Sequence, residues 1–168
     1  RPGIVHRLDQ QTSGIMMIAK DDVSHQHLTE QFKARTVKRI YEALVYGVMQ
    51  HDNGIIQAPI GRHPKNRLKR AVVENGKEAE THFQVLEYFQ DHTHVQCELI
   101  TGRTHQIRVH LKYMNHPIVG DIVYTRRKQT FNKGQALFAR ELSFDHPVRG
   151  ERMTFTVERP TYFQKILD

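Results

Sequence analysis

Residues 81–99 read THFQVLEYFQDHTHVQCEL, and this stretch decides the fold class. It contains two runs of alternating character, residues 81–85 and 93–99, with no helical pattern between them. The alternation predicts that Val95, Cys97 and Leu99 face a core, and that His94, Gln96 and Glu98 face outward. Strands that follow one another without a helix favour antiparallel pairing, because parallel neighbours need a long crossover.

The rest of the chain extends this pattern. Further strands are predicted at residues 4–8, 15–19, 40–46, 54–60, 70–74, 136–144 and 153–157. Residues 15–19 are a continuous apolar run, so we expect burial on both faces. Three helices are predicted: one from the capping residues near Asp21 to about residue 34, one capped by Thr104, and one over residues 160–167. The prediction is an α+β fold with a mixed, mainly antiparallel sheet and a few flanking helices.

Composition narrows the class of protein. The 168 residues are 38% hydrophobic and 26% charged, which is typical of one soluble globular domain. No run approaches the ~20 apolar residues that span a bilayer, and no signal pattern opens the chain. The single cysteine, Cys97, excludes an intramolecular disulfide, so we expect a cytoplasmic protein without a membrane partner. The net charge of +7 favours a polyanionic partner such as nucleic acid.

Three stretches combine polar side chains with sharp turns. HRLDQQTSG (6–14) holds Asp9 where a ligand can reach it, or in an ordinary Asx turn. TGRTHQIRVH (101–110) sets Arg103 and Arg108 around a helix start, which suits an anion, although solvated arginines explain it equally well. KRIYEALVYG (38–47) carries Tyr41 on a strand, where it could stack on a base or simply pack.

Together these stretches resemble the RluA-type pseudouridine synthase family. HRLDQQTSGIMMIAK (6–20) is similar to its aspartate motif, KRIYEALVYG to its tyrosine motif, and GRTHQIRVHLKYMNHPIVGD (102–121) to its arginine motif. PIGRHPKNRLKRAV (59–72) is similar to a segment of the RluD-like branch, which acts on large-subunit ribosomal RNA. The family's early Lys-Pro-Gly motif is expected before Arg1. The resemblance therefore implies a pseudouridine synthase catalytic domain over residues 1–168, lacking its first strands and any S4 RNA-binding domain.

The resemblance implies an isomerase that converts uridine to pseudouridine in RNA, without a metal or another cofactor. The base would leave C1′, turn, and rejoin through C5. Asp9 would be the essential carboxylate, as a nucleophile or as a base at the ribose. Arg108 would pair with Asp9 and favour its charged form. Tyr41 would stack on the target base and take part in the final proton transfer.

Basic residues would bind the RNA. Arg7 would enter the space left by a flipped uridine. The expected RNA-binding set is Arg7, Arg62, Lys65, Arg67, Lys69, Arg70, Arg103 and His105, and a second basic cluster comprises Arg126, Arg127 and Lys128. A solvated hairpin tip is the alternative for residues 62–70.

The expected partner is 23S ribosomal RNA and the expected state a monomer. A synthase acting on transfer RNA, a non-catalytic basic RNA-binding module, and a hydrolase using Asp9 as general base remain alternatives. No metal site is expected among the twelve histidines. His92 and His94 could share a strand face, but no third ligand lies near them in the sequence.

Overall fold

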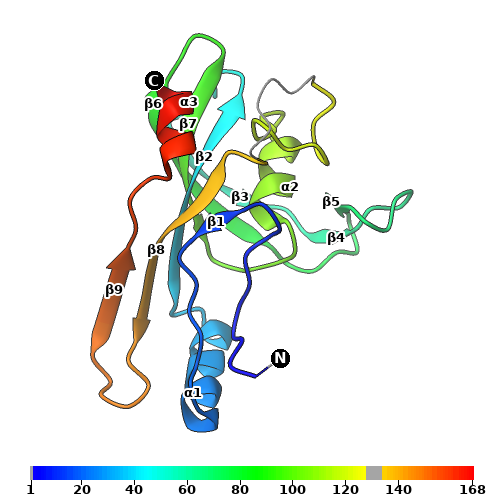
Figure 1. Ribbon diagram of the computed structural model, residues 1–168. Helices are drawn as coiled ribbons and strands as arrows, with labels where there is room; N and C mark the ends of the chain where they lie inside the picture. Colours follow the sequence, from blue (N-terminus) through cyan, green and yellow to red (C-terminus); the bar gives the residue numbers. More distant parts are fainter. Residues whose placement is uncertain (1, 128–133) are drawn as a thin grey trace.

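The computed structural model describes residues 2–127 and 134–168 and is built on one large sheet with a small hairpin beside it (Figure 1). The strands are β1 (Ser13–Gly14), β2 (Lys38–Tyr46), β3 (Asn53–Gln57), β4 (Ile60–Arg62), β5 (Arg70–Val72), β6 (Glu80–Tyr88), β7 (His92–Leu99), β8 (Leu137–Asp145) and β9 (Arg152–Thr156). The helices are α1 (Asp22–Lys33), α2 (Gln106–Tyr113) and α3 (Thr161–Leu167).

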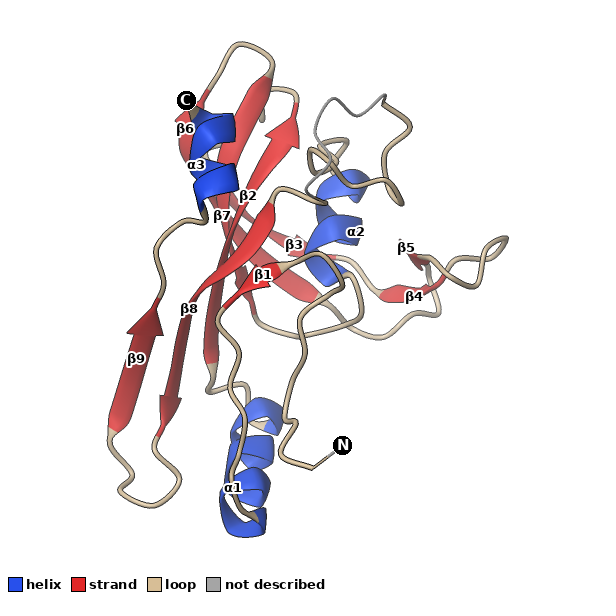
Figure 2. Cartoon of the chain, viewed as in Figure 1, coloured by secondary structure: helices blue, strands red, loops and turns tan. Residues whose placement is uncertain are grey.

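The large sheet of the described residues has seven strands. Their order is β1-β8-β2-β7-β6-β3, and β9 pairs with β8. Every pairing is antiparallel except the short parallel contact of β1 with β8. Strands β4 and β5 form a separate hairpin that projects from the body (Figure 2). The predicted fold class, a mixed and mainly antiparallel sheet with flanking helices, is confirmed.

Different helices cover the two faces of the central strands. Alternation along β2 puts Tyr41 on the face that packs with α2, where Ile107 and Leu111 join the core. The opposite face carries Phe138 of β8, whose ring lies 4.9 Å from the ring of Phe163 in α3. Both faces are buried at the centre of the sheet, so β2 has six consecutive buried residues.

Two predicted strands near the amino end are wrong. Residues 4–8 contribute only an isolated bridge between Ile4 and Ile18, and residues 15–19 form no strand. The paired segment is instead Ser13–Gly14, at one end of the strand order. Because an edge segment has one side open to water, Met17 is buried while Ile18 is 58% exposed. The expectation that this run is buried on both faces is therefore also wrong.

Three local details also differ from expectation. His94 is buried and not outward, because α3 covers the second face of the sheet. Helix α2 begins after His105, which has φ +58° and no side-chain cap bond, so Thr104 is not the cap. The run 54–60 is divided between β3 and β4 at Ala58 and Pro59, where proline supplies no N–H for a ladder.

Candidate active site

Asp9 lies in a tight turn that is fixed against the sheet. The Thr12 amide donates to the Asp9 carbonyl at 3.0 Å, and the buried Gln135 side chain donates to the Gln10 carbonyl and to Thr12 Oγ1, both at 2.9 Å. Gly14 follows with φ +122°, and a Cβ there would lie 2.2 Å from the Ala139 carbonyl oxygen. The glycine thus allows the turn to approach β8 closely enough to hold Asp9 in place.

The Asp9 carboxylate contacts Arg108 of α2. Arg108 Nη1 donates to Asp9 Oδ2 at 3.3 Å, so the Asx turn considered for Asp9 is replaced by a long-range ion pair. The Asp9 side chain is 26% exposed and the Arg108 side chain 5%, which leaves the carboxylate reachable and the guanidinium enclosed. The contact brings together residues 99 positions apart in the chain.

Arg108 is held mainly by Asp121, a residue that sequence reasoning did not single out. Arg108 Nε and Nη2 donate to the two oxygens of Asp121 at 2.7 and 2.9 Å, a bidentate geometry. Burial alone would lower the pKa of Arg108, but the bonds and charges of Asp121 and Asp9 outweigh it and raise that pKa. Arg108 is therefore a fixed cation.

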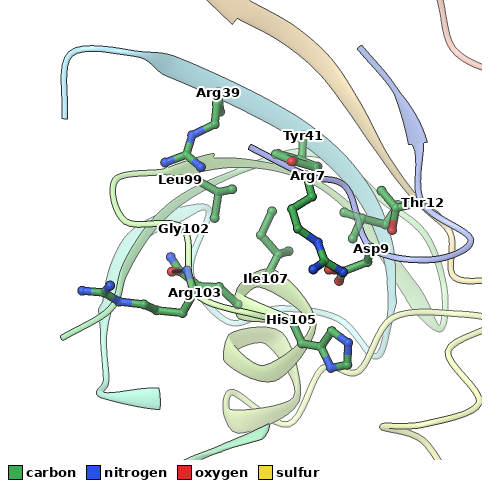
Figure 3. A pocket seen from close by; sticks show the side chains of 12 residues that line it. Arg7, Asp9, Thr12, Arg39, Tyr41, Leu99, Gly102, Arg103, His105 and Ile107 are labelled. Carbon is green, nitrogen blue, oxygen red and sulfur yellow. Dashed lines mark hydrogen bonds between the residues drawn. The ribbon is translucent and has the colours of Figure 1, made fainter. Parts of the chain in front are cut away.

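Tyr41 of β2 faces the same cleft as Asp9 (Figure 3). Apolar side chains from three elements complete this part of the lining: Leu99, Ile107 and Leu137. Burial raises the pKa of Tyr41 to about 12, and the nearby charges of Arg39 and Asp9 act in opposite directions. The phenol is therefore neutral at ordinary pH, and the cleft combines a carboxylate with a flat, uncharged ring.

The loop before α2 is shaped by the Gln106 side chain. Its Oε1 accepts from Thr101 Oγ1 at 2.6 Å and from the Arg103 amide at 3.0 Å, while its Nε2 donates to the Glu80 carbonyl and to Thr81 Oγ1 at 2.9 Å. These four bonds lock the loop to β6. As a result, the position of Arg103 and His105 along the cleft is fixed by a buried amide.

A buried tyrosine connects the cleft to the β4–β5 hairpin. The Tyr124 hydroxyl accepts from the Arg70 amide at 2.9 Å and is hydrogen-bonded to His105 Nδ1. The Arg108 guanidinium lies 5.0 Å from the centre of the Tyr124 ring. Burial, followed by the charge of Arg108, lowers the pKa of His105, so its ring is neutral. Tyr124 therefore contacts the hairpin, the residue before α2 and Arg108 of α2 itself.

The predicted RNA-binding residues fall into three groups. Arg7, Arg103 and His105 line the cleft with Asp9 and Tyr41. Arg62 and Arg70 line a separate groove with Arg103. Lys65, Arg67 and Lys69 lie in the loop between β4 and β5 and away from the cleft.

The second basic cluster is only partly placed. Arg126 and Arg127 are described, and the Arg127 guanidinium lies 4.6 Å from the centre of the Tyr46 ring. Lys128 lies outside the described residues.

Residues 2–127 and 134–168 contain neither a metal-binding cluster nor a membrane-spanning helix. No three His, Cys, Asp or Glu side chains within that part of the chain are grouped to hold a metal ion. His92 is close to the Tyr46 ring, and His94 is hydrogen-bonded to Glu42. No helix among these residues is both long and apolar enough to cross a bilayer.

The geometry of the site also depends on residues that the sequence did not single out. Asp121 had a signal, since it ends the quoted stretch 102–121, but its pairing with Arg108 depends on how α2 and the following loop fold together. Gln106 lies in the same stretch and Tyr124 just beyond it, but the roles of both come from contacts with distant backbone groups, which the sequence does not show. Arg39 lies two positions before Tyr41 and reads in the sequence as an ordinary strand arginine.

Comparison with known proteins gives a consistent result. A family model described as RNA pseudouridylate synthase matches residues 1–113. The chain is 51% identical over 168 residues to the Bacillus subtilis protein named "Uncharacterized RNA pseudouridine synthase YlyB", covering 100% of this chain and 55% of that protein. It is 48% identical over 180 residues to the "Ribosomal large subunit pseudouridine synthase D" of Pseudomonas aeruginosa, covering 99% and 56%.

Solved structures agree with the sequence matches. "Human RNA Pseudouridylate Synthase Domain Containing 1" aligns with a TM-score of 0.81 at 28% identity, over 94% of this chain and 69% of that one. "Human RNA Pseudouridylate Synthase Domain Containing 4" aligns with a TM-score of 0.81 at 26% identity, over 98% and 74%. The chain spans about half the length of the curated relatives it matches.

Proposed function

This chain belongs to the RNA pseudouridylate synthase family, and from that premise we propose that it isomerises uridine to pseudouridine within RNA. The N1–C1′ bond of a uridine breaks and a C5–C1′ bond forms. The proton on C5 is lost and N1 gains one, so atoms and charge balance within a single nucleotide. The reaction needs a carboxylate at the ribose, a surface for the detached base, and a route for one proton.

The observation that carries the proposal is the Asp9–Arg108 contact at a cleft lined by Tyr41. In the proposal Asp9 acts at the ribose, either attacking C1′ or removing a proton from the sugar. Arg108 fixes the orientation of the carboxylate and balances its charge, and Asp121 keeps Arg108 in place. The loosened base lies on the Tyr41 ring while it turns.

Tyr41 also offers a hydroxyl that can donate a hydrogen bond to the uracil. Because burial raises its pKa to about 12, the phenol keeps its proton at neutral pH and is a poor base. In the proposal it contributes a flat face and a hydroxyl proton near the uracil. Arg7, on the same cleft, fills the space that a flipped uridine leaves in the RNA.

RNA is the proposed partner, held by Arg62, Lys65, Arg67, Lys69, Arg70, Arg103 and His105. Phosphate contacts of this kind supply affinity without reading sequence. Large-subunit ribosomal RNA is the proposed substrate, because the Pseudomonas aeruginosa relative is named for that subunit. The name of the Bacillus subtilis relative specifies no target, so transfer RNA is the alternative that the experiment examines.

The test is conversion of labelled RNA. We expect the chain to form pseudouridine in uridine-labelled transcripts of large-subunit ribosomal RNA, measured after digestion to nucleosides, and Asp9→Asn to abolish the product while RNA binding and unfolding are unchanged. Asp91→Asn, at an exposed position between β6 and β7, is the matched control and should retain activity. Retained turnover by Asp9→Asn removes Asp9 from the mechanism.

Other outcomes identify the alternatives. Binding without conversion indicates a non-catalytic module, and release of free uracil indicates a hydrolase with Asp9 as general base. If the chain converts uridine in transfer RNA and not in ribosomal RNA, transfer RNA becomes the substrate in place of ribosomal RNA. Mapping pseudouridines in ribosomal RNA from cells with and without the intact gene then identifies the modified position.

A further inference from the structure

Arg39 of β2 is an arginine with an unused hydrogen-bond donor beside the cleft. Its Nε is buried, and no atom of the described residues accepts a hydrogen bond from it. The ion pairs found among those residues do not include Arg39. Its guanidinium lies 5.2 Å from the centre of the Phe32 ring. A buried polar atom without a partner is uncommon in a folded protein, and a bound ligand is one explanation.

The loop before α2 leaves room for this arginine. A Cβ on Gly102 would lie only 2.5 Å from Arg39 Nη1, so a side chain larger than glycine would push the guanidinium aside. Figure 3 shows Arg39 at one end of the cleft, with Leu99 and Gly102 between it and α2. The chain thus keeps space for a guanidinium at the rim of the proposed active site.

A second groove begins where the cleft ends. Arg39, Gly102 and Arg103 line both, so the two spaces meet at these residues. The groove has a volume of about 410 Å³, within the range of roughly 300–1,000 Å³ that small-ligand sites occupy. Its other lining residues come from the segment before β1, from the end of α1 and the turn after it, and from the two residues that follow β7: Val5, His6, Phe32, Lys33, Arg35, Ile100 and Thr101.

The chemistry of the groove suits a nucleotide. Four of its lining residues are cations and none is a carboxylate; of the cations, Arg35 is paired with Glu78 at 3.1 Å, and Arg103 Nε donates to the Glu78 carbonyl at 2.7 Å. The rings of Phe32 and His6 are stacked at 5.2 Å, which provides an aromatic surface in the same groove. Cations combined with an aromatic surface are the usual features of single-stranded RNA sites.

We infer that Arg39 binds the phosphate adjoining the target uridine, and that the groove beside α1 binds the neighbouring nucleotide of the same strand. The inference rests on the proposed function and adds a subsite to it. With the uridine in the cleft, the adjoining phosphate passes the rim where Arg39 lies. There the guanidinium offers two or more donors to phosphate oxygens, and the neighbouring base reaches the Phe32 side of the groove.

The test measures binding of an RNA stem–loop that has one uridine, in its loop, by fluorescence anisotropy on the Asp9→Asn background. Arg39→Gln should weaken binding by about tenfold, as expected for a hydrogen-bonded charge. It should also reduce the slope of log affinity against log salt by about 0.7, the value for one single-strand phosphate. Arg149→Gln, at an exposed site in the turn between β8 and β9, removes the same charge and should change neither quantity.

Substitutions in the RNA identify the phosphate and the base. A neutral methylphosphonate on one side of the uridine should reproduce the loss and add nothing to Arg39→Gln. Phe32→Leu should weaken binding about fivefold or more, as for one lost base stack. That effect should vanish when the neighbouring nucleotide is abasic. Unchanged thermal unfolding of both variants separates these losses from misfolding.

Contrary results divide between the two proposals. If the chain with Asp9 intact converts RNA but Arg39→Gln binds with parental affinity and salt slope, the Arg39 subsite is wrong and the function stands. The subsite is also wrong if methylphosphonates on both sides of the uridine each weaken RNA binding by Arg39→Gln still further. If the chain neither binds nor converts RNA, both proposals fall.

Discussion

At the scale of single residues, Asp121 determines how Arg108 meets Asp9. The Asp121 and Arg108 side chains are 1% and 5% exposed, so each supplies the opposite charge that the other needs in order to be buried. The Asp121 carboxylate also accepts from the Val123 and Tyr124 amides at 3.1 and 3.3 Å, which fixes the carboxylate itself. The geometry of the Asp9–Arg108 pair is therefore set by a residue that does not line the cleft.

Asp121→Asn should impair both stability and conversion. The amide keeps one acceptor oxygen and turns an N–H₂ group toward a buried guanidinium, and breaking such a pair costs about 3 kcal/mol. We expect kcat to fall at least tenfold with a smaller change in KM, because Arg108 no longer orients Asp9. Asp145→Asn is the control, since its 3.5 Å pair with Arg152 is exposed and worth less than about 1 kcal/mol. An unchanged kcat would contradict the role given to Asp121.

His6 gives the chain a dependence on acid that one substitution isolates. Its Nε2 accepts a hydrogen bond from the Met17 amide at 2.9 Å, so the ring must be neutral there. Burial, with the charge of Arg39 second, lowers the pKa of His6 from 6.5 to about 4. Because the pKa of His6 is lower in the folded protein than in the unfolded one, the unfolded state takes up a proton first as the pH falls. The contribution of neutral His6 to stability is therefore complete above pH 6.5 and is lost as the pH falls from 6.5 toward 4.

We therefore expect His6→Gln to lose part of the parent's acid sensitivity. Glutamine can still accept from Met17 but does not titrate, so the parent should lose up to about 3 kcal/mol relative to this variant between pH 7.5 and 4. Urea unfolding at several pH values measures the difference. His51→Gln, at an exposed position, is the matched control. A difference between the parent and His6→Gln that does not change with pH would contradict the assignment.

At the scale of elements, the β4–β5 hairpin depends on Tyr124 for its position relative to α2. The hydroxyl contacts the Arg70 amide and the His105 ring, so it joins the proposed RNA-binding hairpin to the edge of the cleft. The hairpin also packs through Ile60 and Val72 against Val109 of α2 and the Tyr124 ring, and Ile60 forms an isolated bridge with Lys77 in the segment before β6. Loss of the hydroxyl should loosen it without disturbing Asp9.

Tyr124→Phe should therefore weaken RNA binding more than catalysis. The ring remains under Arg108, but two polar groups lose a partner, at a cost of about 1–3 kcal/mol. We expect the Kd for RNA to rise several-fold while single-turnover conversion of bound RNA is nearly unchanged. Tyr113→Phe, on the exposed side of α2, removes a hydroxyl at the same helix and should change neither. A loss of the single-turnover rate alone would show that Tyr124 acts on Arg108 instead.

The elements that sequence reasoning predicted well are those with strong local periodicity. The alternation at 93–99 and the i, i+4 spacing of Ile107 and Leu111 each predict a buried face from the residues of a single element. The prediction of a buried strand over residues 15–19 was wrong, because apolar character does not show that a segment lies at the edge of a sheet. The prediction that His94 faces outward was wrong, because its burial depends on α3, which lies almost seventy residues away in sequence. The candidate site divides in the same way: Asp9 and Arg108 were predicted from their motifs, whereas the contacts of Asp121, Tyr124 and Arg39 depend on the folded structure.

At the scale of the whole molecule, a buried carboxylate ties the centre of the sheet to its carboxyl-terminal segment. Glu42 of β2 is 1% exposed and contacts His94 Nε2 at 2.7 Å, Arg140 Nη1 at 3.2 Å and Arg159 Nε at 2.8 Å. These partners lie on β7, on β8 and just before α3. The cluster lies on the sheet face that α3 covers, so it supports the strand that carries Tyr41 from behind.

Glu42→Gln should destabilise the whole fold and not only the local contact. Burial alone would raise the pKa of Glu42, but the hydrogen bonds from His94 and Arg159 outweigh it and lower that pKa, so the charged form stabilises the native state. Neutralising it leaves two guanidinium groups facing an amide, and we expect a loss of about 3 kcal/mol or more in urea unfolding. Glu87→Gln, exposed on β6, should change stability by no more than about 0.5 kcal/mol. A carboxylate with a lowered pKa stops stabilising the native state when acid protonates it. The difference in free energy of unfolding between the parent and Glu42→Gln should therefore become smaller at low pH. A difference that stays constant would mean that the charge of Glu42 does not hold the carboxyl-terminal segment.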